Sequence, residues 1–138
     1  MAGITDPKRE LDFIELHDAY ASSEIQTYED LGLCRYGEGY SFVERGDPFL
    51  KGIDYGFPTP KAGVSPVNPS GGLIACGHPV GATGLMQAVF AFWQLQESIP
   101  KHFGDPALQL KHPKRGAIHS HAGTGSSVTV SILERGFR

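Results

Sequence analysis

One stretch of this sequence limits the accessible folds more than any other: residues 68–84, Asn-Pro-Ser-Gly-Gly-Leu-Ile-Ala-Cys-Gly-His-Pro-Val-Gly-Ala-Thr-Gly. It contains five glycines and one histidine, His78, and an almost unbroken apolar run follows at 85–95. Glycine permits positive φ and close approach of a ligand, and the free N–H groups at a helix start favour negative charge. The stretch therefore predicts a tight loop that leads into a buried helix, with a histidine beside an anion-favouring position.

Length and composition exclude several classes of protein. The chain has 138 residues, of which 40% are hydrophobic and 20% charged, with a net charge of −3, which allows one domain with a modest core. The sequence lacks a basic cluster of the kind that binds nucleic acid. It also lacks a signal peptide and a long apolar span, so secretion and membrane insertion are not expected. Cys34 and Cys76 are too few for a disulfide framework and lack metal-ligand spacing. A cytoplasmic protein is expected.

The first predicted elements are a strand and a helix with polar residues between them. Residues 11–16 form the strand, which ends at His17 and Asp18. Asp18 is suited to cap a helix at 19–31, which Gly32 ends. Because α/β proteins usually place their sites where strands end and helices begin, His17 and Asp18 are candidate site residues. The alternative for the pair is a helix cap and a surface histidine.

Residues 35–67 hold six glycines and four prolines and predict a long irregular loop that covers a site. The aromatic residues of this segment either anchor it to the core or line a ligand pocket: Tyr40, Phe42, Phe49, Tyr55 and Phe57.

The second half predicts one very apolar helix and two closing strands. Residues 85–95 are hydrophobic on nearly all sides, so they predict a helix that is packed on several sides and that Pro100 ends. A surface loop over 100–115 leads to strands at 115–125 and 126–133, the second with alternating apolar residues. We expect an α/β fold in which a mixed sheet packs against a buried apolar helix.

Residues 68–84 resemble, position by position, the thiolase signature Asn-x-x-Gly-Gly-x-x-x-x-Gly-His-Pro-x-Gly-x-x-Gly. In thiolases the histidine of Gly-His-Pro activates the nucleophilic cysteine, so the resemblance assigns this role to His78. It also marks Asn68, Gly77 and Gly81 as residues of the site loop. The alternative is a structural turn with an incidental histidine.

Residues 14–34 are similar to the block Glu-x-His-Asp-Cys/Ala-Phe … Tyr-Glu-x-Leu-Gly-Leu/Phe-Cys of the sterol-carrier-type and archaeal-type thiolases. Other thiolases have Asn-Glu-Ala-Phe there. The Asn or His of this motif helps to bind the water that completes one oxyanion hole, which implies that role for His17. Some sterol-carrier-type enzymes place a reactive cysteine two residues later, where this chain has Ala19.

The third block is His-Ala-Gly-Thr-Gly at 121–125. Thiolases have Cys-x-Gly here, with the cysteine as acid/base and the glycine N–H in the second oxyanion hole, and the sterol-carrier-type branch usually has Asn. His121 and Gly123 depart from both patterns, and a histidine at this position is similar to the Cys-His-His ketoacyl synthases, which belong to the same superfamily. Imidazole can do general acid/base work at neutral pH. His119 and His121 also form a pair that could bind a metal, but no cysteine or carboxylate joins them, so no metal is expected.

The three blocks occur in thiolase order over residues 11–133. A whole thiolase is much longer and carries its nucleophilic cysteine in the first half, and neither Cys34 nor Cys76 lies in such a context. We therefore expect residues 1–138 to be a single partial thiolase-like C-terminal domain, with the irregular cover loop at 35–67. It would be a fragment or one subunit of a split enzyme, and it would be inactive alone.

The function that the resemblance implies is the C-terminal catalytic part of a thiolase-like acyltransferase on (3-oxo)acyl-CoA thioesters. Coenzyme A is then a substrate, and no cofactor is expected. The implied partners are the missing N-terminal half or subunit in a homo- or hetero-oligomer, with a small zinc-ribbon/OB-fold accessory protein as a further candidate. Two alternatives remain: a thiolase-like retro-aldolase on acyl-CoA adducts, against which the retained Gly-His-Pro argues, and a non-catalytic scaffold subunit.

Overall fold

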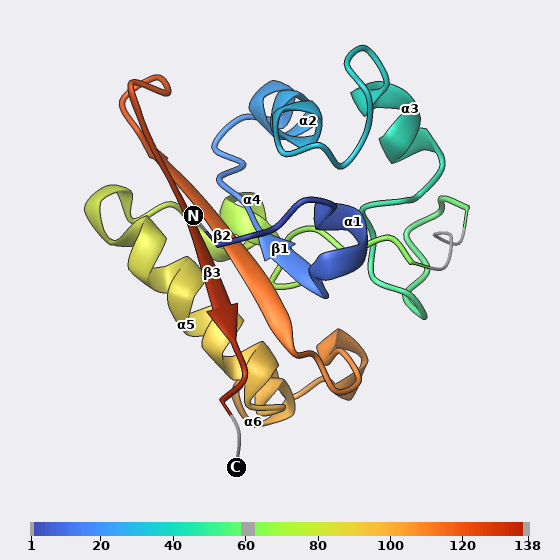
Figure 1. The fold of residues 1–138 in the computed structure, drawn as a ribbon. Helices are drawn as coiled ribbons and strands as arrows, with labels where there is room; N and C mark the ends of the chain where they lie inside the picture. The colour runs from blue at the N-terminus through green and yellow to red at the C-terminus, as the bar shows by residue number, and fades with distance from the viewer. Residues whose placement is uncertain (1, 59–62, 137–138) are drawn as a thin grey trace.

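A three-stranded mixed sheet forms the centre of the structure, a computed structural model that describes residues 2–58 and 63–136. The strand order is β1-β2-β3. β1 (Phe13–Glu15) runs parallel to β2 (Arg115–Ala122), and β2 pairs antiparallel with β3 (Ser127–Glu134). An isolated parallel bridge joins Ile14 to Val67 on the other side of β1. The expected α/β fold with a mixed sheet is confirmed (Figure 1).

One face of the sheet packs against the long helix α5 (Thr83–Leu95). Phe13 of β1 and Ile118 of β2 form an apolar cluster with Ala91 and Leu95 of the helix. A Cβ at Gly116 would overlap the Phe13 ring, so glycine at this position lets the ring lie against β2.

Because side chains alternate along a strand, Ile14 and Ala117 face the opposite side. There they form the larger core cluster with residues of α2 (Ala21–Asp30) and α3 (Gly39–Glu44), among them Tyr28 and Phe42. Figure 1 shows these two helices together on the side of the sheet away from α5. The described chain thus has a helix layer on each face of its sheet.

Short helices interrupt the segments that the sequence predicted to be loops. α1 (Pro7–Glu10) precedes β1, and α3 lies within the cover segment 35–67, of which 59–62 fall outside the described residues. α4 (Gly72–Cys76) and the 3₁₀ turn η1 (Val80–Ala82) divide the glycine-rich stretch, so it is not one continuous loop. α6 (Ile99–Phe103) and η2 (Pro106–Leu108) occupy the predicted surface loop.

Two residues that the sequence assigned to helix ends have other roles in the structure. α5 ends at Leu95 rather than at Pro100, and Pro100 instead lies in the first turn of α6, where its missing N–H costs nothing. α2 begins at Ala21, with no side-chain cap. The Asp18 carboxylate instead accepts the N–H of Leu73, at 2.7 Å, in the first turn of α4. Asp18 therefore caps α4, which lies beside the end of β1, and not α2, the helix that follows Asp18 in the sequence.

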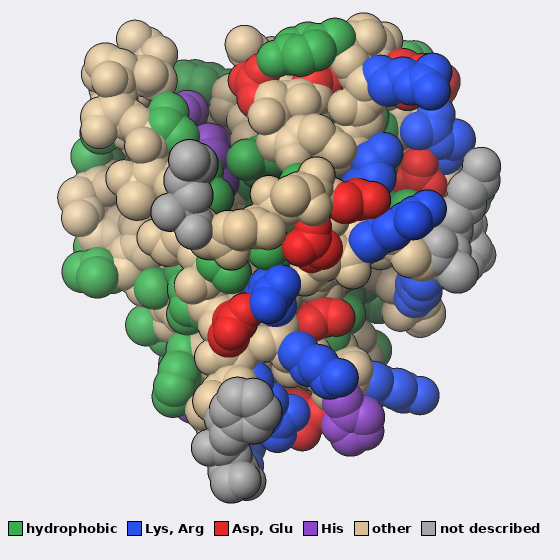
Figure 2. Space-filling model, in the orientation of Figure 1, with side chains coloured by type: hydrophobic (Ala, Val, Ile, Leu, Met, Phe, Trp, Pro, Cys, Tyr) green, Lys and Arg blue, Asp and Glu red, His purple; other side chains and the backbone are tan. Residues whose placement is uncertain are grey.

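Within the described chain, helix α5 is buried on one side rather than packed on several sides. Leu85, Val89 and Phe92 are 72%, 43% and 53% exposed, and they lie on one stripe of the helix. Hydrophobic side chains accordingly gather along the left edge of Figure 2, over α5. With 13 residues α5 is the longest helix of the described chain, and none of the described helices meets the length and apolarity needed to cross a bilayer.

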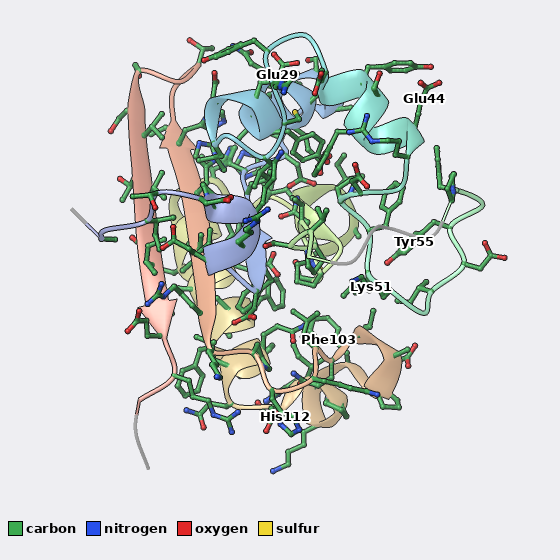
Figure 3. The ribbon with its side chains drawn as sticks, turned by 45° about the vertical axis from the view of Figure 1, so that its right-hand side comes forward. Glu29, Glu44, Lys51, Tyr55, Phe103 and His112 are labelled. Atoms are coloured by element: carbon green, nitrogen blue, oxygen red, sulfur yellow. The ribbon has the colours of Figure 1, made fainter. Side chains whose placement is uncertain are left out.

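The aromatic residues of the cover segment differ in burial. Phe42 is 2% exposed and anchors α3 to the core, whereas Tyr40 is 64% exposed. Phe49 stacks with Tyr55 and Phe57, and the three line a cavity of about 250 Å³. Figure 3 shows Tyr55 on the irregular segment, well away from the sheet.

Candidate active site

Three histidines from three different motifs meet at one end of the sheet. His17 follows β1, His78 lies on the loop between α4 and η1, and His121 lies near the end of β2. The ring centroids of His17 and His121 are 4.0 Å apart, and those of His17 and His78 are 4.9 Å apart. Figure 2 shows histidine side chains in a recess at the upper left of that face. The three predicted site histidines therefore form one cluster with His17 in contact with both others.

His17 is the innermost ring of the cluster. It is 4% exposed, and burial together with the neighbouring His121 and His78 lowers the pKa of its imidazole to about 4. Its Nδ1 is buried and has no hydrogen-bond partner among the described residues. His17 is therefore neutral at physiological pH and keeps an unused hydrogen-bonding atom.

His78 is exposed, and its orientation is set by a residue that the sequence analysis did not single out. The Nδ1 of His78 lies 2.7 Å from the hydroxyl oxygen of Thr83, the buried first residue of α5. The backbone turns sharply before it, since Gly77 has a φ of 92°. A Cβ at Gly81 would meet no heavy atom within 4 Å, so packing within the described chain does not require glycine there.

Asn68 holds the end of β1 in place. Its backbone N–H donates to the carbonyl of Ile14, and its side-chain oxygen accepts the N–H of Leu16, both at 2.7 Å. These bonds continue the pairing that begins at the Ile14–Val67 bridge. Asn68 thus positions the backbone that carries His17.

His121 lies half-buried beside a cavity of about 360 Å³ between α2 and the turn from β2 to β3. Gly123, in this turn, has a φ of 60° and also borders the cavity. The walls contributed by α2 are polar: Ser23, Gln26, Thr27 and Asp30. His121 therefore contacts His17 on one side and an accessible cavity on the other.

His119 points to the same side of β2 as His121 but is 6% exposed. Its Nδ1 accepts the backbone N–H of His17 at 3.5 Å, and its carbonyl accepts a side-chain N–H of Gln87 at 3.1 Å. Burial and the nearby His121 lower the pKa of the His119 imidazole. Within residues 2–58 and 63–136, no three His, Cys, Asp or Glu side chains are grouped to hold a metal.

A buried carboxyl group lies at the end of β1, and it was not identified as a candidate from the sequence. Glu15 is 1% exposed, and its two carboxyl oxygens bond the hydroxyl and the N–H of Ser70 at 2.6 and 3.2 Å. Burial raises its pKa to about 8, against the opposing effect of the Ser70 hydrogen bonds. The sequence feature that could have identified Glu15 is a single acidic residue inside an apolar strand, Phe-Ile-Glu-Leu at 13–16.

Neither cysteine is an activated thiol. Cys34 is buried, and burial raises its pKa. The Cys76 thiol donates to the carbonyl of Ser70 at 3.1 Å, and burial followed by the charges of Glu15 and Asp18 raises its pKa as well. A nucleophilic cysteine needs the thiolate form, which both environments disfavour.

Comparison with known proteins agrees with the arrangement of these motifs. The family model described as "Thiolase C-terminal domain-like" matches residues 1–135. This chain belongs to the thiolase C-terminal domain-like family. Sterol carrier protein 2 of Homo sapiens is 39% identical over 128 residues, which are 93% of this chain and 20% of that protein.

Two archaeal relatives carry the name acetyl-CoA acetyltransferase. The protein of Methanothermobacter thermautotrophicus is 38% identical over 91% of this chain and 28% of its own length. That of Methanocaldococcus jannaschii is 39% identical over 96% of this chain and 30% of its own length. The chain thus spans between one fifth and three tenths of the length of these three relatives.

Proposed function

We propose that this domain supplies the histidines of a thiolase-like acyl transfer on acyl-CoA thioesters, with a nucleophilic cysteine from outside residues 1–138. The observation that carries the proposal is the contact of His17 with both His78 and His121, at ring distances of 4.9 and 4.0 Å. The names of the archaeal relatives support the choice of acetyl-CoA and its homologues as substrates.

In the first step His78 is the base. It takes the proton of the cysteine thiol, the thiolate attacks the thioester carbonyl, and the same histidine returns the proton to the departing CoA thiolate. The Thr83 hydroxyl, 2.7 Å from Nδ1, fixes the ring so that Nε2 remains free for this exchange. A water bound by the neutral His17 would donate to the oxygen on which negative charge develops.

In the second step His121 is the acid/base. It removes a proton from the α-carbon of the second acyl-CoA, and the resulting carbanion attacks the acyl-enzyme. The turn that contains Gly123 borders the cavity beside His121, and its N–H would hold the enolate oxygen. Thiolysis is the same sequence in reverse.

The test separates the two steps in the enzyme assembled with its cysteine-bearing part. His78→Ala should abolish the acyl-enzyme, whereas His121→Ala should leave acylation largely intact and block carbon–carbon bond formation. Each loss should be about 10²-fold or more, the usual scale for a lost general acid/base. Quenched-flow trapping with a labelled acyl-CoA measures both steps.

His102→Ala is the matched control, because His102 is exposed and stacks on Trp93 away from the cluster. It should change neither step. Normal acylation and normal condensation by both site variants would contradict the catalytic proposal.

The second candidate function is a non-catalytic interaction domain. The observation that favours it is the exposed apolar stripe of α5, formed by Leu85, Val89 and Phe92, together with the two cysteines of raised pKa. In that case the domain would bind the remaining part of a thiolase-like assembly without taking part in its chemistry. Normal kinetics of both histidine variants would favour this function.

A further inference from the structure

The proposed condensation releases a proton at one histidine and needs it at another. The α-proton of the second acyl-CoA moves to His121, the new carbon–carbon bond forms, and the carbon–sulfur bond of the acyl-enzyme breaks. The sulfur leaves with the bonding electron pair as a thiolate. To regain the thiol, this sulfur must receive a proton from His78, its partner in the first step. In each turnover His121 must therefore lose one proton and His78 must gain one, either by exchange with solvent or by transfer through the protein.

The described structure places one side chain in contact with both ends of that path. The His17 ring lies 4.0 Å from the ring of His121 and 4.9 Å from that of His78. We propose that His17 carries the proton from His121 to His78, accepting it on one ring nitrogen while it releases the proton of the other. The inference rests on the proposed function and assigns His17 a task beyond holding a water.

The surroundings of His17 suit a group that passes a proton without retaining it. The ring is 4% exposed, its Nδ1 has no hydrogen-bond partner within the described ranges, and burial and the neighbouring histidines lower its pKa. The adjacent Asp18 carboxylate bonds the N–H of Leu73. The rings meet edge to face and at a tilt, and each transfer would require a rotation of the His17 ring or one bridging water.

His119 is less suited to this path. Its Nδ1 accepts the backbone N–H of His17, and its ring centroid is 5.8 Å from that of His121. The other charged group that acts on it is the Asp30 carboxylate, which opposes the lowering of its pKa. Its ring therefore braces the backbone of His17.

His17→Asn in the assembled enzyme tests the inference, with acetyl-CoA as the probe. An amide can hold a water but cannot relay a proton, so the acyl-enzyme and the first equivalent of product should form at nearly the wild-type rate. Later turnovers should slow by about 10-fold or more, because the variant lacks the proton transfer that returns His121 and His78 to their starting protonation states. The fast first turnover and the slower later ones together give a burst of product. Added imidazole should restore the slow phase with saturation and leave the wild-type rate unchanged.

His17→Gln is a second variant in case the asparagine protein does not fold, and His102→Asn is the control that should show no burst. Three results would overturn the relay while leaving the proposed function in place: no burst, a slow phase that imidazole does not accelerate, or loss of acylation, which would make His17 an oxyanion group alone. Failure of the proposed function is a different result, namely normal acylation and condensation by His78→Ala and His121→Ala.

Discussion

Glu15 is a buried carboxyl group whose ionisation opposes folding. Among the described residues, Ser70 is the hydrogen-bond partner of this 1% exposed carboxylate and no cation pairs with it, so the group loses its hydration without compensation by an opposite charge. The side chain therefore keeps its proton in the folded state up to a pKa of about 8, compared with 4.5 for an unperturbed glutamate. The nearby Asp18 charge acts in the same direction.

At the residue scale we predict that Glu15 makes the domain less stable as the pH rises. Between about pH 4.5 and 8 the folded state holds a proton that the unfolded state has lost, so the free energy of unfolding falls by up to about 1.4 kcal/mol per pH unit. Below pH 4.5 both states are protonated, and the penalty is absent. Glu15→Gln should flatten this slope and raise the melting temperature at pH 8.

Thermal melts at half-unit intervals of pH measure the effect of Glu15→Gln. The control is Glu44→Gln, which removes an equal charge from an exposed position and should leave the slope unchanged. Equal slopes for Glu15→Gln and wild type would show that Glu15 does not carry this dependence.

At the scale of the element, α5 reverses the usual pattern of a surface helix. Its buried face includes Gln87 and Gln94, each 1% exposed, while Leu85 and Phe92 are in solvent. The buried amides are used: Gln87 donates to the carbonyl of His119 at 3.1 Å, and Gln94 donates to that of Leu108 at 2.7 Å. The polar residues tie the helix to β2 and η2, and the apolar stripe has no partner within the described chain.

We predict that this stripe makes residues 1–138 self-associate or bind the remaining part of the enzyme, because a large exposed apolar patch favours association. Leu85→Lys combined with Phe92→Lys should increase the monomer fraction in light scattering and change the unfolding midpoint little. Phe90→Ala is the contrasting variant, since Phe90 is 9% exposed on the packed face and its loss should cost about 3–5 kcal/mol. A monodisperse wild-type monomer at high concentration would contradict the prediction.

At the scale of the whole molecule, the described chain holds the proposed base and the proposed acid/base but no activated nucleophile. Cys34 is buried, and the Cys76 thiol is bonded to the carbonyl of Ser70. Purified residues 1–138 should therefore show no CoA-dependent thiolysis of acetoacetyl-CoA in a spectrophotometric assay. Turnover should require the addition of a thiolase part that carries the nucleophilic cysteine. Robust activity of the isolated chain would refute the proposal that the nucleophile comes from outside residues 1–138.

The sequence alone was sufficient for the family and for the list of candidate histidines. Three motifs with fixed spacing carry this information, because a loop of given length with glycines at set places presents its histidine in only a few ways. The strand at 11–16 and the closing pair of strands were predictable for a similar reason, since alternation and apolar runs are local patterns. Their pairing in one mixed sheet agrees with that prediction.

The tertiary structure alone decided how these parts act on one another. His17 contacts both other histidines because β1 pairs in parallel with β2 and because Val67 pairs with Ile14 on the other side of β1. The cap by Asp18 and the buried carboxyl of Glu15 depend on α4 lying against the end of β1. These side-chain contacts join residues that are between 55 positions apart, for Asp18 and Leu73, and 104 positions apart, for His17 and His121. Local sequence patterns cannot encode such contacts, because the desolvation and hydrogen bonding that set each pKa arise only when distant segments pack together.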